Sequence, residues 1–316
     1  MRTVLANEVP DRAAAERLAA AHARHVQRTA RIDPLVRPGE PVERGRVLEH
    51  GAALGVATVS EQESLWAARR THVLQPRIAD GAEPDWGGLL DAWLAVVEAD
   101  PAAREVETSA GVSLASRDHA LVEELVRRHL GPASVLAVRT LDRPDDAAPP
   151  VPHGVVVRPA TAAPDDLRWL LDRSVALQAW EAGLGYVPRR SEAEVLLGAD
   201  LEVAIRRDLG WTWIAELDGE PVAFVQVNPP EEAEWVAGQT WLAPVGYLVS
   251  AYVDPALRSG GLGRVLVAAA HARARDDGWS ALLLHHAASS AWSAPFWGSL
   301  GYRPLVTTWM RRPAVR

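Results

Sequence analysis

The stretch Arg258–Gly263, RSGGLG, joins two segments of different character. The residues before it, GYLVSAYVDP (246–255), have the composition of a buried strand, and those after it, RVLVAAAHARARDDG (264–278), carry apolar residues at helical spacing. Glycine is a poor helix former, so three glycines in four positions need a separate reason. The first backbone N–H groups of a helix have no intrahelical partner, and glycine lets an anion approach them closely. The stretch therefore predicts a phosphate-binding loop.

Two common phosphate loops do not match this stretch. The P-loop ends in Gly-Lys-Ser/Thr, whereas Arg264 and Val265 follow the last glycine here. The dinucleotide pattern G-x-G-x-x-G is absent, because the glycines fall at positions 260, 261 and 263. The pattern that does match is Arg-x-x-Gly-x-Gly. A second segment, APFWGSLGYRP (294–304), has an aromatic pair followed after three residues by Gly-Tyr.

With both segments at these distances, the sequence resembles the GNAT superfamily of acyl-CoA-dependent N-acyltransferases. The signature loop of that family, [QR]-x-x-G-x-[GA], lies between its fourth strand and its third helix. Residues from about 154 to 312 follow the family order, β-α-α-β-β-β-α-β-α-β, with a hairpin at Asp218-Gly219. The resemblance implies a mixed α/β fold, acetyl-CoA as coenzyme and N-acetyltransferase activity.

The resemblance also implies how coenzyme A is held. The backbone of Ala251, Tyr252 and Val253 would lie beside the pantetheine arm. Ser290 stands where many relatives have an Asn that touches this arm, and Trp297 stands where the family has its usual proton-donating Tyr. The pyrophosphate would be bound by Arg258, Ser259, Gly260, Gly261, Leu262, Gly263 and Arg264.

Acyl transfer to an amine needs a base, because a lysine-like amine has a pKa near ~10.4 and its neutralisation at neutral pH costs about 4 kcal/mol. Many relatives use a carboxylate on the fourth strand, but Tyr247 stands there, and a phenol is a poor base at its ordinary pKa. His285 and His286 end the next predicted strand and are the substitute bases. Successive strand residues face opposite sides, so at most one faces the substrate. A core or surface role for each histidine, and a water molecule held by Tyr247, stay open as alternatives.

The acceptor is predicted to be a primary amine of a small molecule or peptide. Glu181 and Tyr186 fall in the region where relatives often contact the acceptor. Glu234 belongs to an acidic stretch that also contains Glu231 and Glu232 and would attract a cationic substrate; a solvated loop is the alternative. Two further functions stay open: an acetyltransferase of the mycothiol synthase type, and a non-catalytic acyl-CoA-binding regulatory protein.

The first half of the chain repeats this order weakly but lacks the loop. The Pro-rich stretch 143–153 is a predicted linker, which separates residues 1–142 from a catalytic domain at 154–316. Asp80, Glu83 and Asp85 stand near the corresponding helix start, where three carboxylates would repel a pyrophosphate. Residues 1–142 are therefore predicted to form a degenerate GNAT-like domain without coenzyme.

Composition excludes several other functions. The net charge is −8 and all 33 basic residues are Arg, so no excess of basic charge favours nucleic acid as a partner. The absence of Cys excludes disulfides, thiolate metal sites and a Cys nucleophile, and no metal site is expected. No apolar run is long enough for a membrane span and no signal peptide is recognisable, so a cytoplasmic location is predicted. The oligomeric state stays open.

Overall fold

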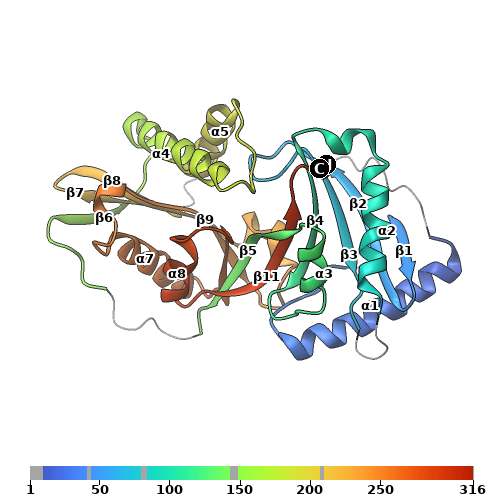
Figure 1. Ribbon diagram of the computed structural model, residues 1–316. Helices are drawn as coiled ribbons and strands as arrows, with labels where there is room; N and C mark the ends of the chain where they lie inside the picture. Colours follow the sequence, from blue (N-terminus) through green and yellow to red (C-terminus); the bar gives the residue numbers. More distant parts are fainter. Residues whose placement is uncertain (1–9, 41–43, 80–83, 143–148, 207–209, 316) are drawn as a thin grey trace.

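The computed structural model describes residues 10–40, 44–79, 84–142, 149–206 and 210–315 (Figure 1). The first half of the chain contains α1 (Arg12–Ile32), β1 (Arg46–His50), β2 (Ala53–Glu61), β3 (Arg70–Pro76), α2 (Trp86–Glu98), β4 (Thr108–Ala115), α3 (Val122–Arg127) and β5 (Gly131–Thr140). The second half contains β6 (Val155–Pro159), α4 (Pro164–Gly183), α5 (Ala193–Arg206), β7 (Thr212–Leu217), β8 (Glu220–Asn228), α6 (Glu234–Ala237), β9 (Val245–Val253), α7 (Leu262–Asp276), β10 (Ala281–Ala287), α8 (Ser293–Ser299) and β11 (Arg303–Arg311). The mixed α/β fold class is confirmed, and the predicted order of the second half is present.

One continuous sheet runs through both halves, with the strand order β1-β2-β3-β4-β11-β5-β10-β9-β8-β7-β6. From either edge inward it has the same construction: antiparallel strands, then a parallel pair, then antiparallel strands at the centre. The parallel pairs are β3 with β4 and β9 with β10. The fold is thus two copies of one arrangement, as the weak repeat in the sequence suggested.

The two copies exchange their last strands. β11, from the end of the chain, pairs with β4 of the first half, and β5, from the first half, pairs with β10 of the second. β5 and β11 also pair with each other at the centre of the sheet. The predicted boundary at 142 and 154 divides the sequence, but the strands on either side of it complete each other's sheet.

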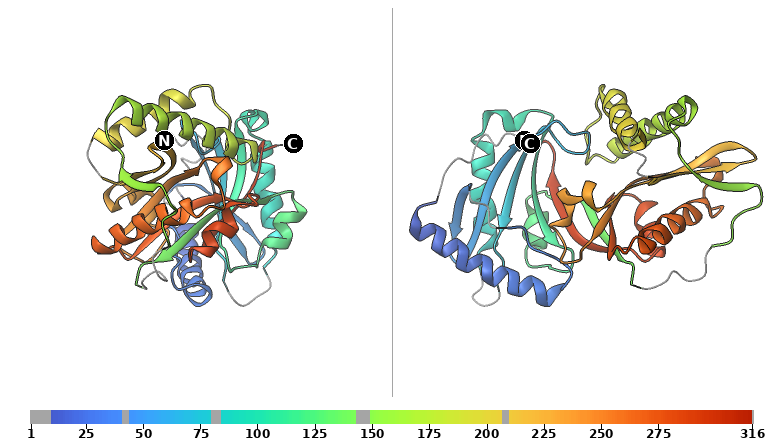
Figure 2. Two further views of the ribbon diagram at one scale, coloured as in Figure 1. Left: turned by 90° about the vertical axis from the view of Figure 1, so that its left-hand side faces the viewer. Right: turned by 180° about the vertical axis from the view of Figure 1, so that it is seen from behind.

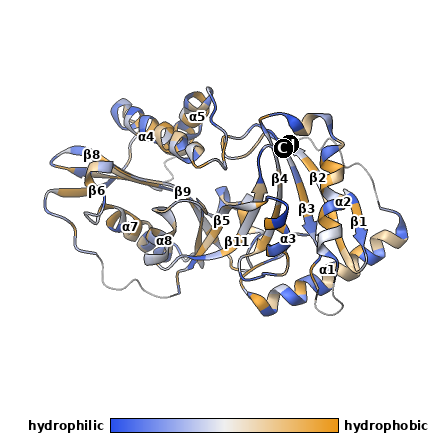
Figure 3. Cartoon of the chain, in the orientation of Figure 1, coloured by the Kyte–Doolittle hydropathy of each residue, from blue (hydrophilic) through white to orange (hydrophobic). Residues whose placement is uncertain are grey.

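Helices cover both faces of the sheet (Figures 1 and 2). In the second half, α7 and α8 lie on one face and α4 and α5 on the other; in the first half, α2 and α1 lie on opposite faces. Figure 3 shows apolar residues concentrated in the strands and in α2, and a mixture of polar and apolar residues along α1. This distribution matches a two-sided core, because each helix buries one apolar stripe against the sheet.

The core on the α7 face fixes the position of the loop before α7. Leu266 and Ala270 of α7 are buried among strand residues that include Val225, Leu248 and Leu284. On the opposite face, α4 and α5 pack through a smaller apolar cluster. Within the part of the chain that the structure describes, no helix has both the length and the apolar character to cross a membrane.

Candidate functional site

The parallel strands β9 and β10 separate part of the way along their length. They pair at Val245–Ala281, Gly246–Leu282 and Tyr247–Leu283 and, in the described structure, not beyond. From that point β9 continues beside β8 and β10 continues beside β5. A gap therefore opens between the two strands, and the RSGGLG loop follows the strand on one side of it.

The loop leaves the N-terminus of α7 open. Gly261 is the N-cap residue, has φ of 89° and provides no side-chain cap. A Cβ placed on Gly261 would meet no atom within 4 Å, so the space beside this residue is open, and the first N–H groups of a helix have no intrahelical partner. A Cβ on Gly263 would come within 3.0 Å of the Phe296 ring, which explains a glycine at that position by packing against α8. An anion would therefore find space beside Gly261 at the start of α7.

The two arginines of the loop make contacts within the protein. Nε of Arg258 donates to the Val253 carbonyl at 3.3 Å, and Nη2 of Arg264 donates to Ser299 Oγ at 2.8 Å. Both side chains are exposed in part, and each lies next to the loop. Their predicted contact with a pyrophosphate would add to, or replace, these bonds.

The equivalent helix start in the first half is closed. The Asp85 carboxylate accepts a hydrogen bond from the backbone N–H of Gly88 at 2.7 Å and lies 3.0 Å from His50 Nδ1. The Asp85 carboxylate thus lies at the N-terminus of α2 where a bound anion would otherwise lie. Asp80 and Glu83 lie outside the described residues. In the described structure, a side chain caps the N-terminus of α2, whereas none caps that of α7.

A tyrosine–histidine pair lies at the point where β9 and β10 separate. The Tyr247 hydroxyl and His285 Nδ1 are 3.0 Å apart, and the exposed Trp235 ring packs edge-on against Tyr247 and parallel to His285. Burial, with a smaller contribution from His286, lowers the pKa of His285 to about 4. Burial also raises the pKa of Tyr247 above its ordinary value. Both groups are therefore uncharged at neutral pH.

A second polar pair faces the first from α4 and the loop after it. The Tyr186 hydroxyl donates to the Glu181 carboxylate, and both side chains are partly buried. Burial raises the pKa of Glu181, while the hydrogen bond from Tyr186 opposes this rise. Glu181 also contributes to raising the pKa of Tyr247, which places the two pairs in one electrostatic environment. Four of the predicted catalytic and acceptor residues thus come together.

Two other predicted residues lie elsewhere. His286 is buried, and its Nδ1 lies 3.0 Å from the Ala287 carbonyl, as the alternation of side chains along β10 requires. Glu234 is exposed at the first residue of α6. Its neighbour Trp235, which the sequence analysis did not single out, is the residue of this helix that covers Tyr247 and His285.

Ser290 and Trp297 have structural contacts in the protein itself. The Ser290 hydroxyl accepts from the backbone N–H of Ser293 at 3.0 Å and donates to its hydroxyl at 2.9 Å, at the start of α8. Trp297 is buried between Phe296 and Tyr302. A coenzyme contact for either residue stays a prediction.

The match to known proteins agrees with this geometry. Residues 176–302, from α4 through the loop and α8, match the model of the Acetyltransferase (GNAT) family. This part of the chain matches a GNAT domain. A search of curated proteins found no match.

Solved structures that are similar to this one cover most of the chain. A GCN5-related N-acetyltransferase from Sphaerobacter thermophilus is 16% identical, with a TM-score of 0.50, covering 84% of this chain and 80% of its own. A GCN5-related N-acetyltransferase from Kribbella flavida is 15% identical, with a TM-score of 0.45, and the match covers 93% of this chain and 94% of its own. A tandem GNAT protein from the clavulanic acid biosynthesis pathway is 12% identical, with a TM-score of 0.48, and the match covers 98% of each chain. The Sphaerobacter thermophilus structure supports the fold assigned to both halves of the chain.

Proposed function

We propose that the second half transfers an acetyl group from acetyl-CoA to a primary amine of a small molecule or peptide. The observation that carries the proposal is the open N-terminus of α7 beside a strand gap that ends at the Tyr247–His285 pair. A coenzyme with a pyrophosphate at one end and a reactive thioester at the other fits both features.

The residues present suit coenzyme A. The N–H groups of Gly261, Leu262 and Gly263 would bind the pyrophosphate, where no side chain competes. The separated edge of β9 at Ala251–Val253 would hold the pantetheine arm. Bound acetyl-CoA would supply an acyl carbon that an amine can attack.

His285 is the proposed base. For its Nε2 to accept a proton, the hydrogen of the imidazole must lie on Nδ1, where the Tyr247 oxygen accepts it at 3.0 Å. The low pKa of about 4 keeps the ring neutral at physiological pH, so this lone pair is always free. An imidazole of this kind is a weak base, but an amine nitrogen becomes far more acidic as it bonds to the acyl carbon. Proton transfer at that stage needs no strong base.

Glu181 is the proposed recognition group for the acceptor. An amine arrives at neutral pH as an ammonium ion, which a partly buried carboxylate attracts and which gives up one proton to solvent before its nitrogen attacks the acyl carbon. Tyr186 holds the Glu181 carboxylate by a hydrogen bond and so fixes its position. The acceptor nitrogen would then lie between Glu181 and the Tyr247–His285 pair.

A non-catalytic acyl-CoA-binding protein is the second candidate. Trp297 in place of the usual tyrosine, and Tyr247 in place of a carboxylate, favour it, since neither side chain is a strong acid or base at neutral pH. The two candidates differ in whether coenzyme A is released when amines are added.

Thiol release from acetyl-CoA, measured over a panel of polyamines, amino sugars and peptides, tests the proposal. We expect release with at least one amine and none with Gly261→Glu, whose carboxylate would fill the anion position. Gly51→Glu is the matched control, because Gly51 also has a positive φ of 55° and no atom within 4 Å of a Cβ, but lies in the β1–β2 turn. Acetyl-CoA binding without release by any amine would select the second candidate, and release unaffected by Gly261→Glu would exclude the loop as the coenzyme site.

A further inference from the structure

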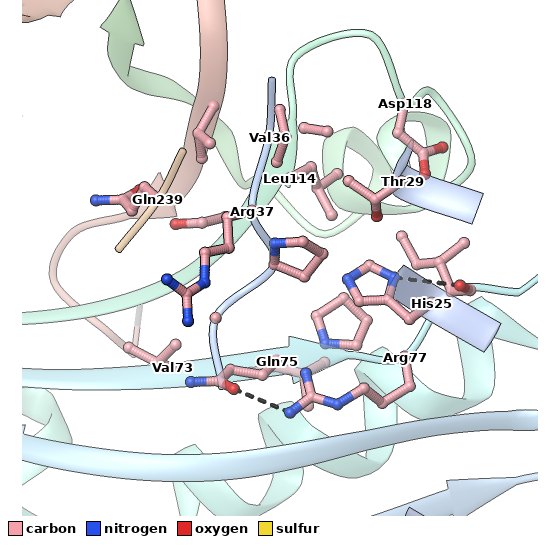
Figure 4. A pocket seen from close by; sticks show the side chains of 18 residues that line it. His25, Thr29, Val36, Arg37, Val73, Gln75, Arg77, Leu114, Asp118 and Gln239 are labelled. Atoms are coloured by element: carbon pink, nitrogen blue, oxygen red, sulfur yellow. Dashed lines mark hydrogen bonds between the residues drawn. The ribbon is translucent and has the colours of Figure 1, made fainter. Parts of the chain in front are cut away.

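A cavity of about 270 Å³ lies in the first half, between α1 and the parallel strands β3 and β4 (Figure 4). These strands pair as far as Val73–Gly111 and then separate, as β9 and β10 do in the second half. The cavity begins at Val73 and follows β3 to Ile78, with His25 of α1 opposite. It thus has the place in the first half that the Tyr247–His285 pair has in the second.

One buried cation in the cavity has no anionic partner among the residues that the structure describes. Arg77 lines the cavity with only 6% of its surface exposed. Its Nη2 donates to Gln75 Oε1 at 3.2 Å, and its Nε has no hydrogen-bond partner in the described structure. Burial lowers the pKa of Arg77, and no carboxylate counteracts this effect. A buried guanidinium with an unused donor is costly unless an anion pairs with it.

The other charged groups of the cavity are already compensated. Asp118 accepts two hydrogen bonds from Arg28, and Arg37 donates to Glu40 at 2.6 Å. His25 contacts the Ile78 carbonyl through Nδ1, and burial lowers its pKa to about 4, so it is neutral. Outside the cavity lining, His22 is also affected by Arg77, and burial lowers its pKa too. Among its described residues, the cavity therefore presents one uncompensated positive charge.

The remaining walls are largely apolar and come from both halves of the chain. Val36, Val73, Leu114 and Val306 contribute aliphatic surface, and Pro38 and Pro76 add two rings. A guanidinium whose Nε has no partner can form a charge-assisted hydrogen bond to a carboxylate oxygen. A phosphate dianion would need further positive charge, but Arg37, the other cation of the described lining, is already paired with Glu40.

We propose that this cavity binds a small apolar carboxylic acid, with its carboxylate on Arg77 and its carbon skeleton against the aliphatic walls. The site is separate from the coenzyme loop and does not depend on the acyl-transfer proposal. Its ligand is defined by two properties together: one negative charge and an apolar body small enough for the cavity.

Calorimetry on the full chain tests this assignment with butyrate, benzoate and phenylacetate, each compared with its primary amide. The acid and the amide have nearly the same shape and differ in charge. We expect at least one carboxylate to bind once per chain and its amide to bind at least tenfold more weakly. Equal affinities of acid and amide, absence of binding by all three acids, or tighter binding of inorganic phosphate would each overturn the proposal.

Single substitutions test whether the carboxylate binds in this cavity. Arg77→Gln should weaken carboxylate binding at least tenfold, whereas Arg46→Gln, the same change at an exposed residue of β1, should leave it within twofold. Gly261→Glu should also leave it unchanged, which separates this site from the coenzyme loop. If Arg77→Gln does not fold, Val306→Phe provides the second test, because a ring at this partly buried wall position would fill the cavity and exclude the ligand. Retained affinity in a folded Arg77→Gln or Val306→Phe protein would contradict the assignment.

Discussion

The hydroxyl of Tyr247 should matter for catalysis through its hydrogen bond to His285. Tyr247→Phe keeps the ring, which packs against Trp235, and removes only the oxygen 3.0 Å from His285 Nδ1. The imidazole would then lose the group that holds its hydrogen on Nδ1 and its lone pair on Nε2. The buried Nδ1 would be left without this partner.

The size of the effect follows from that orphaned group. Leaving a buried polar atom unsatisfied costs about 1–3 kcal/mol. If the cost appears in the barrier to acyl transfer, the rate falls by roughly five- to 150-fold. Removing the base itself, as in His285→Ala, should cost about a hundredfold or more.

The assay is steady-state thiol release at saturating acetyl-CoA between pH 5.5 and 9, with acetyl-CoA affinity measured separately. We expect Tyr247→Phe to lower kcat and to leave coenzyme affinity unchanged. Because the pKa of His285 is about 4, protonation of this ring should not limit the wild-type rate anywhere in that range.

Tyr302→Phe is the control, since the Tyr302 hydroxyl also lies 3.0 Å from a buried imidazole nitrogen, Nε2 of His271. It should reduce thermal stability without changing kcat by more than about twofold. The reasoning is refuted if Tyr247→Phe and His285→Ala both keep the wild-type rate and pH profile, or if Tyr302→Phe lowers kcat as much as Tyr247→Phe.

Three further predictions test other parts of the structure. Trp297→Phe should keep activity within about tenfold, because coenzyme A can leave as a thiolate with a pKa near ~8.5 and water can protonate it later; loss of all thiol release in a folded variant would assign a chemical role to the indole. Asp166 accepts two hydrogen bonds from Arg158, which lower its pKa to about 2, so its contribution to stability is present above about pH 4 and is lost as the pH falls toward 2. Denaturant unfolding should therefore show Asp166→Asn to be less stable by about 2 kcal/mol at pH 7 and nearly equal to wild type at pH 2, whereas an equal difference at both pH values would contradict the assigned pKa. A fragment of residues 150–316 lacks β5, which pairs with β10 and β11, and should show no cooperative unfolding unless residues 1–142 are supplied; a folded, coenzyme-binding fragment would contradict strand exchange as a requirement.

The local parts of the fold could be predicted from the sequence. The Asp218-Gly219 turn has positive φ at both residues, 53° and 89°, as the hairpin signal requires. The strand, loop and helix around RSGGLG also follow from residues that are close in sequence. The exchange of β5 and β11 could not be predicted, because SVLAVRT and LVTTWM are ordinary buried-strand sequences and their partners are chosen by contacts across the whole chain.

The candidate site also has parts that could be predicted from the sequence and parts that could not. Sequence alternation indicated that at most one of His285 and His286 faces the substrate, but the choice depends on the register of β10 against β9. Trp235 was missed because its acidic neighbours, Glu232 and Glu234, favoured a solvated loop. Arg77 carried no signal at all, since a single arginine after a strand is normally exposed.

The most direct test of the account is the number of acetyl-CoA molecules that bind the full chain. Calorimetry should give one site per chain, because the N-terminus of α7 is open and that of α2 is capped by Asp85. Two equivalent sites would show that the first half also binds coenzyme. No binding would contradict the assignment of RSGGLG as a pyrophosphate loop and, with it, the proposed activity.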